Sequence, residues 1–142
     1  MTNTCVLEFK VRDYECDMDQ VVNNAVYLHY LEHARHEMLG TLGIQFGELL
    51  RQGISLVVTR IEVDFKASLR SGDVFEVRST LQRLGRVRLQ FHQNIYRVSD
   101  QRWMLGAVVT GTALNARGRP EIPPQLEAVL PALPQAGQLP SV

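Results

Sequence analysis

The feature that most constrains the fold is a stretch with helical periodicity, Asn24 to Leu39. Its apolar positions follow steps of four, three, four and four, which line one face of a helix; they are Tyr27, Leu31, Ala34, Met38 and Leu42. No Pro or Gly interrupts the stretch, Asn23 and Asn24 are good N-cap types, and Gly40 is a candidate stop. Such a helix of about 16 residues spans roughly 24 Å, so it can carry a sheet along its length.

Five stretches alternate apolar and polar residues with the period of two that is typical of half-buried strands. One precedes the helix and four follow it; they cover residues 4–11, 55–65, 74–81, 87–98 and 103–115. In the second stretch the apolar face contains Val57, Thr59, Ile61, Val63 and Phe65. Turns are expected at residues 71–73, at Gly85 and at residues 99–100. Because the last four strands are joined by short connections, we expect them to form an antiparallel meander.

These elements predict an α+β fold, in which a curved antiparallel sheet of about five strands wraps around one long central helix. Residues 43–53 are expected to form a short second helix that Gly53 terminates. At 142 residues the chain is expected to be one domain, residues 1–142. Residues 120–142 form a Pro-rich C-terminal tail with a possible helical turn at 125–129.

Composition narrows the classes of partner. The chain has 15 basic and 15 acidic side chains, which argues against nucleic acid or an anionic membrane as a bulk partner. It contains two cysteines and no apolar run long enough for a membrane span, so we expect a cytoplasmic location. His29, His33 and His36 share one helix face, a spacing that can bind zinc. A zinc site would also require a third ligand and buried residues that orient the ligands, and the sequence shows neither. Surface histidines are therefore favoured, and no metal site is expected.

The loop and helix start carry a family resemblance. Asp17, Val22, Ala25 and Tyr27, followed by Glu32, Ala34, Arg35 and Glu37, match the pattern of the hotdog-fold thioesterases, specifically the 4-hydroxybenzoyl-CoA thioesterase-like family. The amino-acid sequences of residues 13–17 and 21–27 are especially similar to those of the acyl-lipid (acyl-ACP) thioesterase branch. Residues 65–73 and 118–123 resemble further family segments, so the match extends to about Pro124.

Three positions depart from the family pattern. Gln20 replaces a glycine three residues after Asp17, and glutamine adopts positive φ at greater cost than glycine. Ser68 replaces a common proline. Asn24 replaces a histidine that some relatives carry before the helix, so a role for that histidine does not transfer.

The resemblance implies thioester hydrolysis, which needs a base or nucleophile and donors for the developing oxyanion. Asp17 is the candidate nucleophile or general base. The amides of Asn24 and Ala25 are the candidate oxyanion hole, reinforced by the helix dipole. The alternative is that Asp17 only caps a turn, as loop aspartates usually do.

Further residues are candidate substrate contacts: Asn23, Tyr27, Phe65, Lys66, Arg83, Arg86 and Arg88. The three arginines surround one turn and could bind the phosphates of coenzyme A or of a carrier-protein thioester. Glu37 is expected to be structural, paired with a strand arginine. Cys16 is expected to be a packed thiol.

The predicted function is therefore an acyl-CoA or acyl-carrier-protein thioesterase that releases a free carboxylic acid and a thiol. It would need no cofactor beyond the coenzyme A or phosphopantetheine of its substrate. The resemblance also implies a homodimer through edge-to-edge sheet pairing, often a homotetramer, with the acyl pocket at the subunit interface. Two alternatives stay open: a hotdog dehydratase or hydratase, which normally uses a histidine, and a non-catalytic acyl-binding module.

Overall fold

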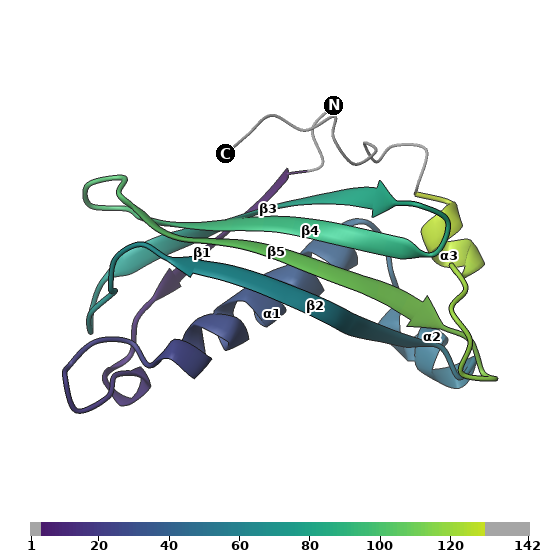
Figure 1. Cartoon of the computed structure of the whole chain (residues 1–142), viewed down its shortest axis with the longest axis horizontal. Coiled ribbons are helices and arrows are strands. Elements are labelled where there is room, and N and C mark those ends of the chain that lie inside the picture. The colour runs from purple at the N-terminus through teal and green to yellow at the C-terminus, as the bar shows by residue number, and fades with distance from the viewer. Residues whose placement is uncertain (1–3, 130–142) are drawn as a thin grey trace.

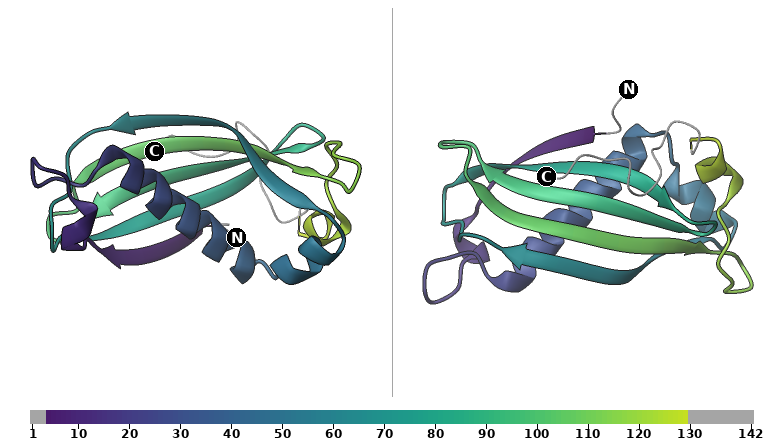
Figure 2. Two further views of the ribbon diagram at one scale, coloured as in Figure 1. Left: turned by 90° about the horizontal axis from the view of Figure 1, so that it is seen from below. Right: turned by 45° about the horizontal axis from the view of Figure 1, so that its top comes forward.

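A curved antiparallel sheet with one long helix across its concave face dominates the computed structural model, which describes residues 4–129 (Figure 1). The strands are β1 (Thr4–Lys10), β2 (Ser55–Phe65), β3 (Val74–Leu84), β4 (Arg88–Arg97) and β5 (Trp103–Leu114). The helices are η1 (Asp13–Glu15, a 3₁₀ turn), α1 (Asn24–Thr41), α2 (Phe46–Arg51) and α3 (Pro124–Glu127). Seen from below, α1 runs obliquely under the sheet (Figure 2). The expected fold class is confirmed.

The strand order corrects the expected four-strand meander. The order is β1-β3-β4-β5-β2 with every neighbouring pair antiparallel, so β3, β4 and β5 form a meander but β2 pairs with β5. The connection from β2 to β3 crosses the end of the molecule where α1 begins. There the Val22 amide donates to the Leu69 carbonyl oxygen at 2.9 Å, and Leu69 is fully buried. The connection therefore covers the core at this end of the molecule. The neighbour of β3 in the sheet is β1 and not β2.

Helix α1 keeps the predicted apolar face and runs two residues further than predicted. Tyr27, Leu31, Ala34 and Met38 are buried. The helix ends at Thr41 with Leu42 as its C-cap, and the left-handed residue that follows is Gly43, with φ 92°, rather than Gly40. The Ile44 amide donates to the Leu39 carbonyl and the Gly43 amide to the Gly40 carbonyl. This pattern is a Schellman motif, which places the left-handed glycine after the helix.

Helix α2 is shorter than the predicted span of 43–53, because Gly43 and Ile44 are used in the Schellman motif that follows α1. Its predicted stop is confirmed: Gly53 has φ 72°. The tail packs through α3, where Leu126 is fully buried, and residues 130–142 lie outside the described range. Among residues 4–129, no helix combines the length and hydropathy required to span a bilayer.

A β-bulge interrupts the edge strand β2. Val58 lies opposite Gly111 and Arg60 opposite Thr110, so Thr59 is the extra residue. The bulge reverses the alternation, which places Leu56 and Val58 on the face of Ile61; the prediction that Val57 and Thr59 share this face is wrong. A Cβ atom on Gly111 would lie 2.7 Å from the Val57 carbonyl oxygen, so the close approach of the two strands requires glycine.

The loop before α1 is a tight turn that depends on Gln20. The Asp17 amide donates to the Val21 carbonyl at 2.9 Å, and the Gln20 amide donates to the Asp17 carbonyl at 3.0 Å. Gln20 has φ 62°, the left-handed conformation that glycine adopts more easily. The glutamine that replaces the family glycine therefore adopts the same kind of turn, but with a strained backbone.

Replacing two glycines by alanine should have opposite effects. Gly111→Ala should lower the free energy of unfolding by about 1–3 kcal/mol, because the new methyl group meets the Val57 carbonyl. Gly40→Ala, where nothing lies within 4 Å of the new atom, should raise it by about 0.5–1 kcal/mol. Urea denaturation at one protein concentration measures both. Equal effects would contradict the described close approach.

The strain at Gln20 predicts that Gln20→Gly raises the free energy of unfolding by about 0.5–1 kcal/mol. Gln20→Val should lower it by about 1–2 kcal/mol, because a β-branched residue resists positive φ more strongly. The same denaturation experiment applies. A loss of stability in Gln20→Gly would show that this turn has a different backbone conformation.

Candidate active site

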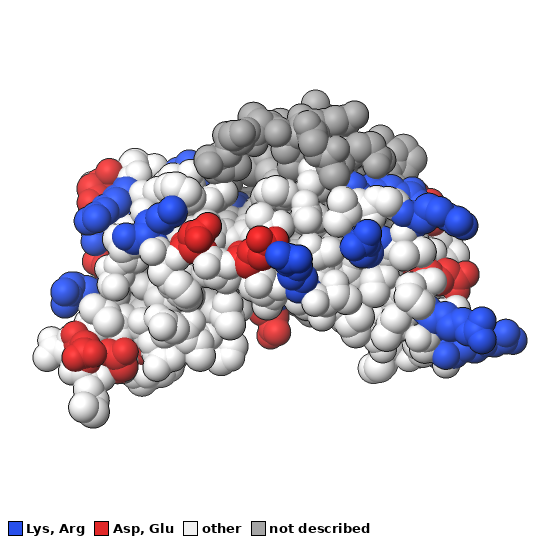
Figure 3. All heavy atoms as spheres, viewed as in Figure 1, with Lys and Arg blue, Asp and Glu red and all other residues white. Residues whose placement is uncertain are grey.

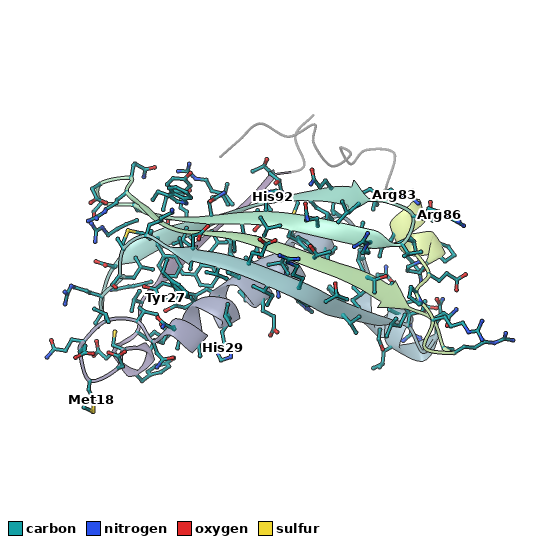
Figure 4. All side chains as sticks on the ribbon, in the orientation of Figure 1. Met18, Tyr27, His29, Arg83, Arg86 and His92 are labelled. Carbon is teal, nitrogen blue, oxygen red and sulfur yellow. The ribbon has the colours of Figure 1, made fainter. Side chains whose placement is uncertain are left out.

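Asp17 lies on the exposed loop at the end of the molecule where α1 begins, beside Met18, which Figure 4 labels at the tip. Its Oδ1 accepts a hydrogen bond from the Asp19 amide at 2.9 Å. This is the turn-capping role that the sequence left open. Its Oδ2 has no hydrogen-bond partner among residues 4–129. One carboxylate oxygen thus holds the turn, and the other faces solvent.

The base of this loop joins the start of α1. Cys16 pairs with Val22 in an isolated bridge, and the Asn23 amide donates to the Glu15 carbonyl at 3.0 Å. Asn23 is the N-cap: its Oδ1 accepts from the Ala25 amide at 2.9 Å.

The cap determines which amide is free to bind an oxyanion. The Ala25 amide is committed to Asn23, and the Val26 amide donates to the Asn23 carbonyl at 2.9 Å. The Asn24 amide makes no hydrogen bond within the described part of the chain. Of the two predicted donors, Asn24 is therefore the available one. The dipole of α1 adds about half a positive charge at this end.

The predicted apolar contacts lie next to this helix start. Tyr27 is buried, its hydroxyl oxygen accepts from the Leu69 amide at 2.8 Å, and burial raises the pKa of its phenol. Phe65, at the end of β2, packs edge-on against the Tyr27 ring at 5.6 Å and is half-exposed. Lys66 Nζ lies 4.9 Å from the centre of the Trp103 ring. Tyr27 is a core residue, whereas Phe65 and Lys66 reach the surface.

Two of the predicted arginines, Arg83 and Arg86, lie at the opposite end of the molecule from Met18, the residue after Asp17 (Figure 4). Arg88 starts β4, directly after the same turn. Arg83 binds its own turn, donating to the carbonyls of Gly85 and Arg86, and it pairs with Glu127 at 3.7 Å. Arg86 and Arg88 are exposed. Basic side chains gather at this end (Figure 3); the turns and α2 there carry Arg51, Arg83, Arg86, Arg88, Arg117 and Arg119.

Other candidates have structural roles. Glu37 pairs with His33 at 3.8 Å, on its own helix, so its predicted pairing with a strand arginine is wrong. His36 stacks on Phe46 with ring centres 4.0 Å apart. The described residues hold no cluster of potential metal ligands. Cys16 packs partly buried against the core, as predicted.

Glu15, in the same acidic loop, also has a structural role. Its Oε1 accepts from the Tyr30 hydroxyl and from the Arg12 amide, both at 2.8 Å. Burial, together with this carboxylate, raises the pKa of Tyr30. Glu15 therefore anchors the loop to α1.

Two cavities flank α1, and Asp17 lines neither. One, of about 490 Å³, lies between the second half of α1, α2 and the strands β2, β4 and β5. Its walls are mostly apolar, but Glu32, Arg35 and His36 also line it. The other, of about 920 Å³, lies between β1 and α1 and is lined partly by Phe9, His29 and His33.

Glu32, Arg35 and His36 line the smaller cavity, although no sequence pattern predicted this position for them. The available signal was their spacing of three and four, which places three polar side chains together on one helix face. The sequence pattern could not show that these three residues line a cavity, because the opposite wall of that cavity comes from α2 and from the bulged start of β2. The positions of these two elements relative to α1 cannot be read from the sequence pattern.

Known proteins resemble this chain in sequence and in fold. The sequence profile of the thioesterase-like superfamily matches residues 11–130. The chain is 40% identical over 114 residues to acyl-acyl carrier protein thioesterase ATL2, a chloroplastic protein of Arabidopsis thaliana. That match covers 80% of this chain and 61% of the relative, so the chain spans less than two thirds of the relative's length.

Two further comparisons are shorter or more distant. The acyl-CoA thioester hydrolase YbgC of Escherichia coli is 30% identical over 95 residues, which cover 66% of this chain and 71% of that protein. The crystal structure of Slr0204, a 1,4-dihydroxy-2-naphthoyl-CoA thioesterase from Synechocystis, superposes with a TM-score of 0.84. It covers 92% of this chain and 97% of that one at 17% identity, which shows the fold alone. The profile match and the superposition together show that this chain belongs to the thioesterase-like superfamily and has the hotdog fold.

Proposed function

We propose that this protein hydrolyses an acyl thioester to a free carboxylic acid and a thiol. The observation that carries the proposal is that one loop, whose base is bonded to the start of α1, carries a carboxylate oxygen without a partner, Asp17 Oδ2, while the Asn24 amide at that helix start is free. Asp17 either attacks the thioester carbon and expels the thiolate as the C–S bond breaks, forming an anhydride that water then cleaves, or removes a proton from a water that attacks the same carbon and displaces the thiolate. In both cases the carbonyl oxygen becomes negative, and the Asn24 amide stabilises it.

The names of the relatives support this class of substrate. ATL2 is named for acyl carrier protein thioesters and YbgC for acyl-CoA thioesters. We therefore propose a coenzyme A or carrier-protein thioester as substrate. The chemistry requires no metal or prosthetic group beyond the one that the substrate brings.

The exposed edge of β2 supports a homodimer. On its concave face Val58, Ile61 and Phe65 remain 46%, 41% and 49% exposed, because α1 does not cover them, and Leu28 of α1 is also exposed. The outer backbone groups of this edge strand have no neighbouring strand within the described residues. A second copy that pairs with this edge would cover both the apolar side chains and the backbone groups.

Antiparallel pairing of two β2 strands would also complete the site. The start of β2 lines the 490 Å³ cavity, and its end at Phe65 lies beside the start of α1. A two-fold axis between the strands brings the start of one β2 to the end of the other. The Asp17 loop of each copy then lies near the cavity and the basic end of its neighbour, where the acyl group and the phosphates would bind.

A second candidate is hydration or dehydration of an acyl thioester. Glu32 and His36 line the same cavity from α1, and a carboxylate with a histidine can move a proton on an acyl chain. His36, however, stacks on Phe46, and Asp17 would have no role in this chemistry. Hydration of an enoyl thioester would be the activity to measure.

Asp17→Asn should lower kcat at least 100-fold, because the amide is neither a base nor a nucleophile. Asp19→Asn is the matched control and should retain activity, since Asp19 contributes its backbone amide to the turn. Thiol release from short, long, β-keto and aromatic acyl-CoAs and from acyl carrier protein thioesters measures both. Full activity in Asp17→Asn, together with a loss in Glu32→Gln, would move the reaction to the helix carboxylate.

Ile61→Asp should convert the proposed dimer to a monomer, since it places a charge on the apolar face of β2. Val6→Asp is the control: Val6 is 52% exposed on β1, at the opposite edge of the sheet. Analytical ultracentrifugation measures the assembly, and thiol release should be lost with the dimer. A monomeric wild type, or an Ile61→Asp dimer, would contradict pairing through β2.

A further inference from the structure

Arg35 carries a buried positive charge that forms no ion pair with a carboxylate of the described residues. Its side chain is only 9% exposed and lines the apolar cavity. The guanidinium donates from Nη1 to Gln93 Oε1 at 3.1 Å, and within residues 4–129 it forms no ion pair. Residues 1–3 and 130–142 contain no Asp or Glu. Protein side chains therefore leave this charge unpaired.

Such a charge is unfavourable in an empty cavity. Burial lowers the pKa of the Arg35 guanidinium, and the Glu32 carboxylate one turn earlier opposes that shift only from an exposed position. An arginine nevertheless stays protonated at neutral pH, and it carries five N–H groups, one of which is used by Gln93. A buried ion without a partner is strongly destabilising, which favours a ligand that supplies the opposite charge.

The guanidinium is also held in place. Gln93 is fully buried, and its Nε2 donates at 3.0 Å both to the Leu31 carbonyl and to Ser79 Oγ. These two bonds fix the side-chain amide so that its oxygen faces Arg35. The positive group is thus positioned before any ligand enters, which reduces the entropy lost on binding.

The rest of the cavity suits an alkyl chain. Beyond the polar residues of α1, its walls are mainly apolar; they include Leu39, Leu49, Leu89, Phe91, Val109 and Leu126. Its volume of about 490 Å³ lies in the range of small-molecule sites. An occupant that satisfies both parts has an apolar tail and one compact anionic group.

We propose that Arg35 binds the carboxylate of an alkyl carboxylic acid whose chain fills this cavity. The planar guanidinium matches a carboxylate through two parallel hydrogen bonds. This inference rests on the proposed function, because such an acid is the product of thioester hydrolysis. The thioester itself is uncharged at this position, so Arg35 favours product over substrate, and the free acid inhibits the enzyme in competition with the acyl thioester.

Calorimetric titration of octanoate and 1-octanol into the 142-residue chain at pH 7 tests the proposal, because the two ligands share a chain and differ in charge. Wild type should bind the acid at least tenfold more tightly than the alcohol. Arg35→Met should bind both equally, with its affinity for the alcohol unchanged, and Arg35→Lys should retain part of the preference. Arg102→Met, at an exposed arginine between β4 and β5 that lines neither cavity, is the control and should behave as wild type.

A measurement on the wild type alone covers the case in which the variants do not fold. The carbon-13 signal of carboxyl-labelled octanoic acid, bound and titrated, should give a pKa below that of the free acid, since Arg35 stabilises the carboxylate. A bound pKa equal to or above the free value would overturn the proposal. Equal binding of acid and alcohol by the wild type would also overturn it, as when a second copy supplies a carboxylate to Arg35.

Thiol release on the same preparations separates the two proposals. Acid-selective binding without turnover on any thioester would keep the Arg35 site and reject the proposed hydrolysis. Turnover without acid selectivity would keep the hydrolysis and reject the Arg35 site.

Discussion

The packing of one apolar helix face into a concave sheet is the constraint on which the rest of this structure depends. Tyr27, Leu31, Ala34 and Met38 of α1 lie against the strands, and they divide between the two apolar clusters of the core. Burial of these side chains is the main favourable contribution that a domain of this size obtains. Because the helix lies obliquely, it leaves the concave face of β2 partly uncovered. The uncovered start of β2 forms part of the wall of the apolar cavity.

Both parts of the site are attached to the same helix but at different ends. The start of α1 offers a free amide at the base of the Asp17 loop, and its second half lines the apolar cavity with Glu32, Arg35 and His36. The 18 residues of α1 span about 27 Å. That separation is the physical reason for proposing that a second copy contributes to each site, since one protomer does not bring its carboxylate to its own cavity.

Local patterns in the sequence were sufficient for the elements but not for their arrangement. The period of 3.6 gave α1, and the period of two gave β2 with its observed bounds, because burial on one face imposes those periods directly. The position of β2 beside β5 depends on the crossing of Leu69 under the helix start, a long-range contact without a local signature. The bulge at Thr59 is equally hidden, because it is defined by the partner strand at Gly111.

The site shows the same division between local and long-range information. Asp17 and the N-cap at Asn23 are neighbours in sequence, so a motif can point to them. Arg35 belongs to the same motif, but its environment is formed by Gln93 on β4 and by walls from α2 and α3. No window of adjacent residues shows that a guanidinium is buried there without an acid.

The burial of Leu126 has a consequence for how this protein could diverge. Leu126 comes from α3, after the last strand, and it lines the apolar cavity. Part of the cavity wall thus comes from a segment that belongs neither to the sheet nor to the Asp17 loop. Changes in that segment could alter which molecules fit the cavity while the Asp17 loop and the scaffold stay the same, so the shape of the cavity and the candidate reacting groups are free to evolve separately.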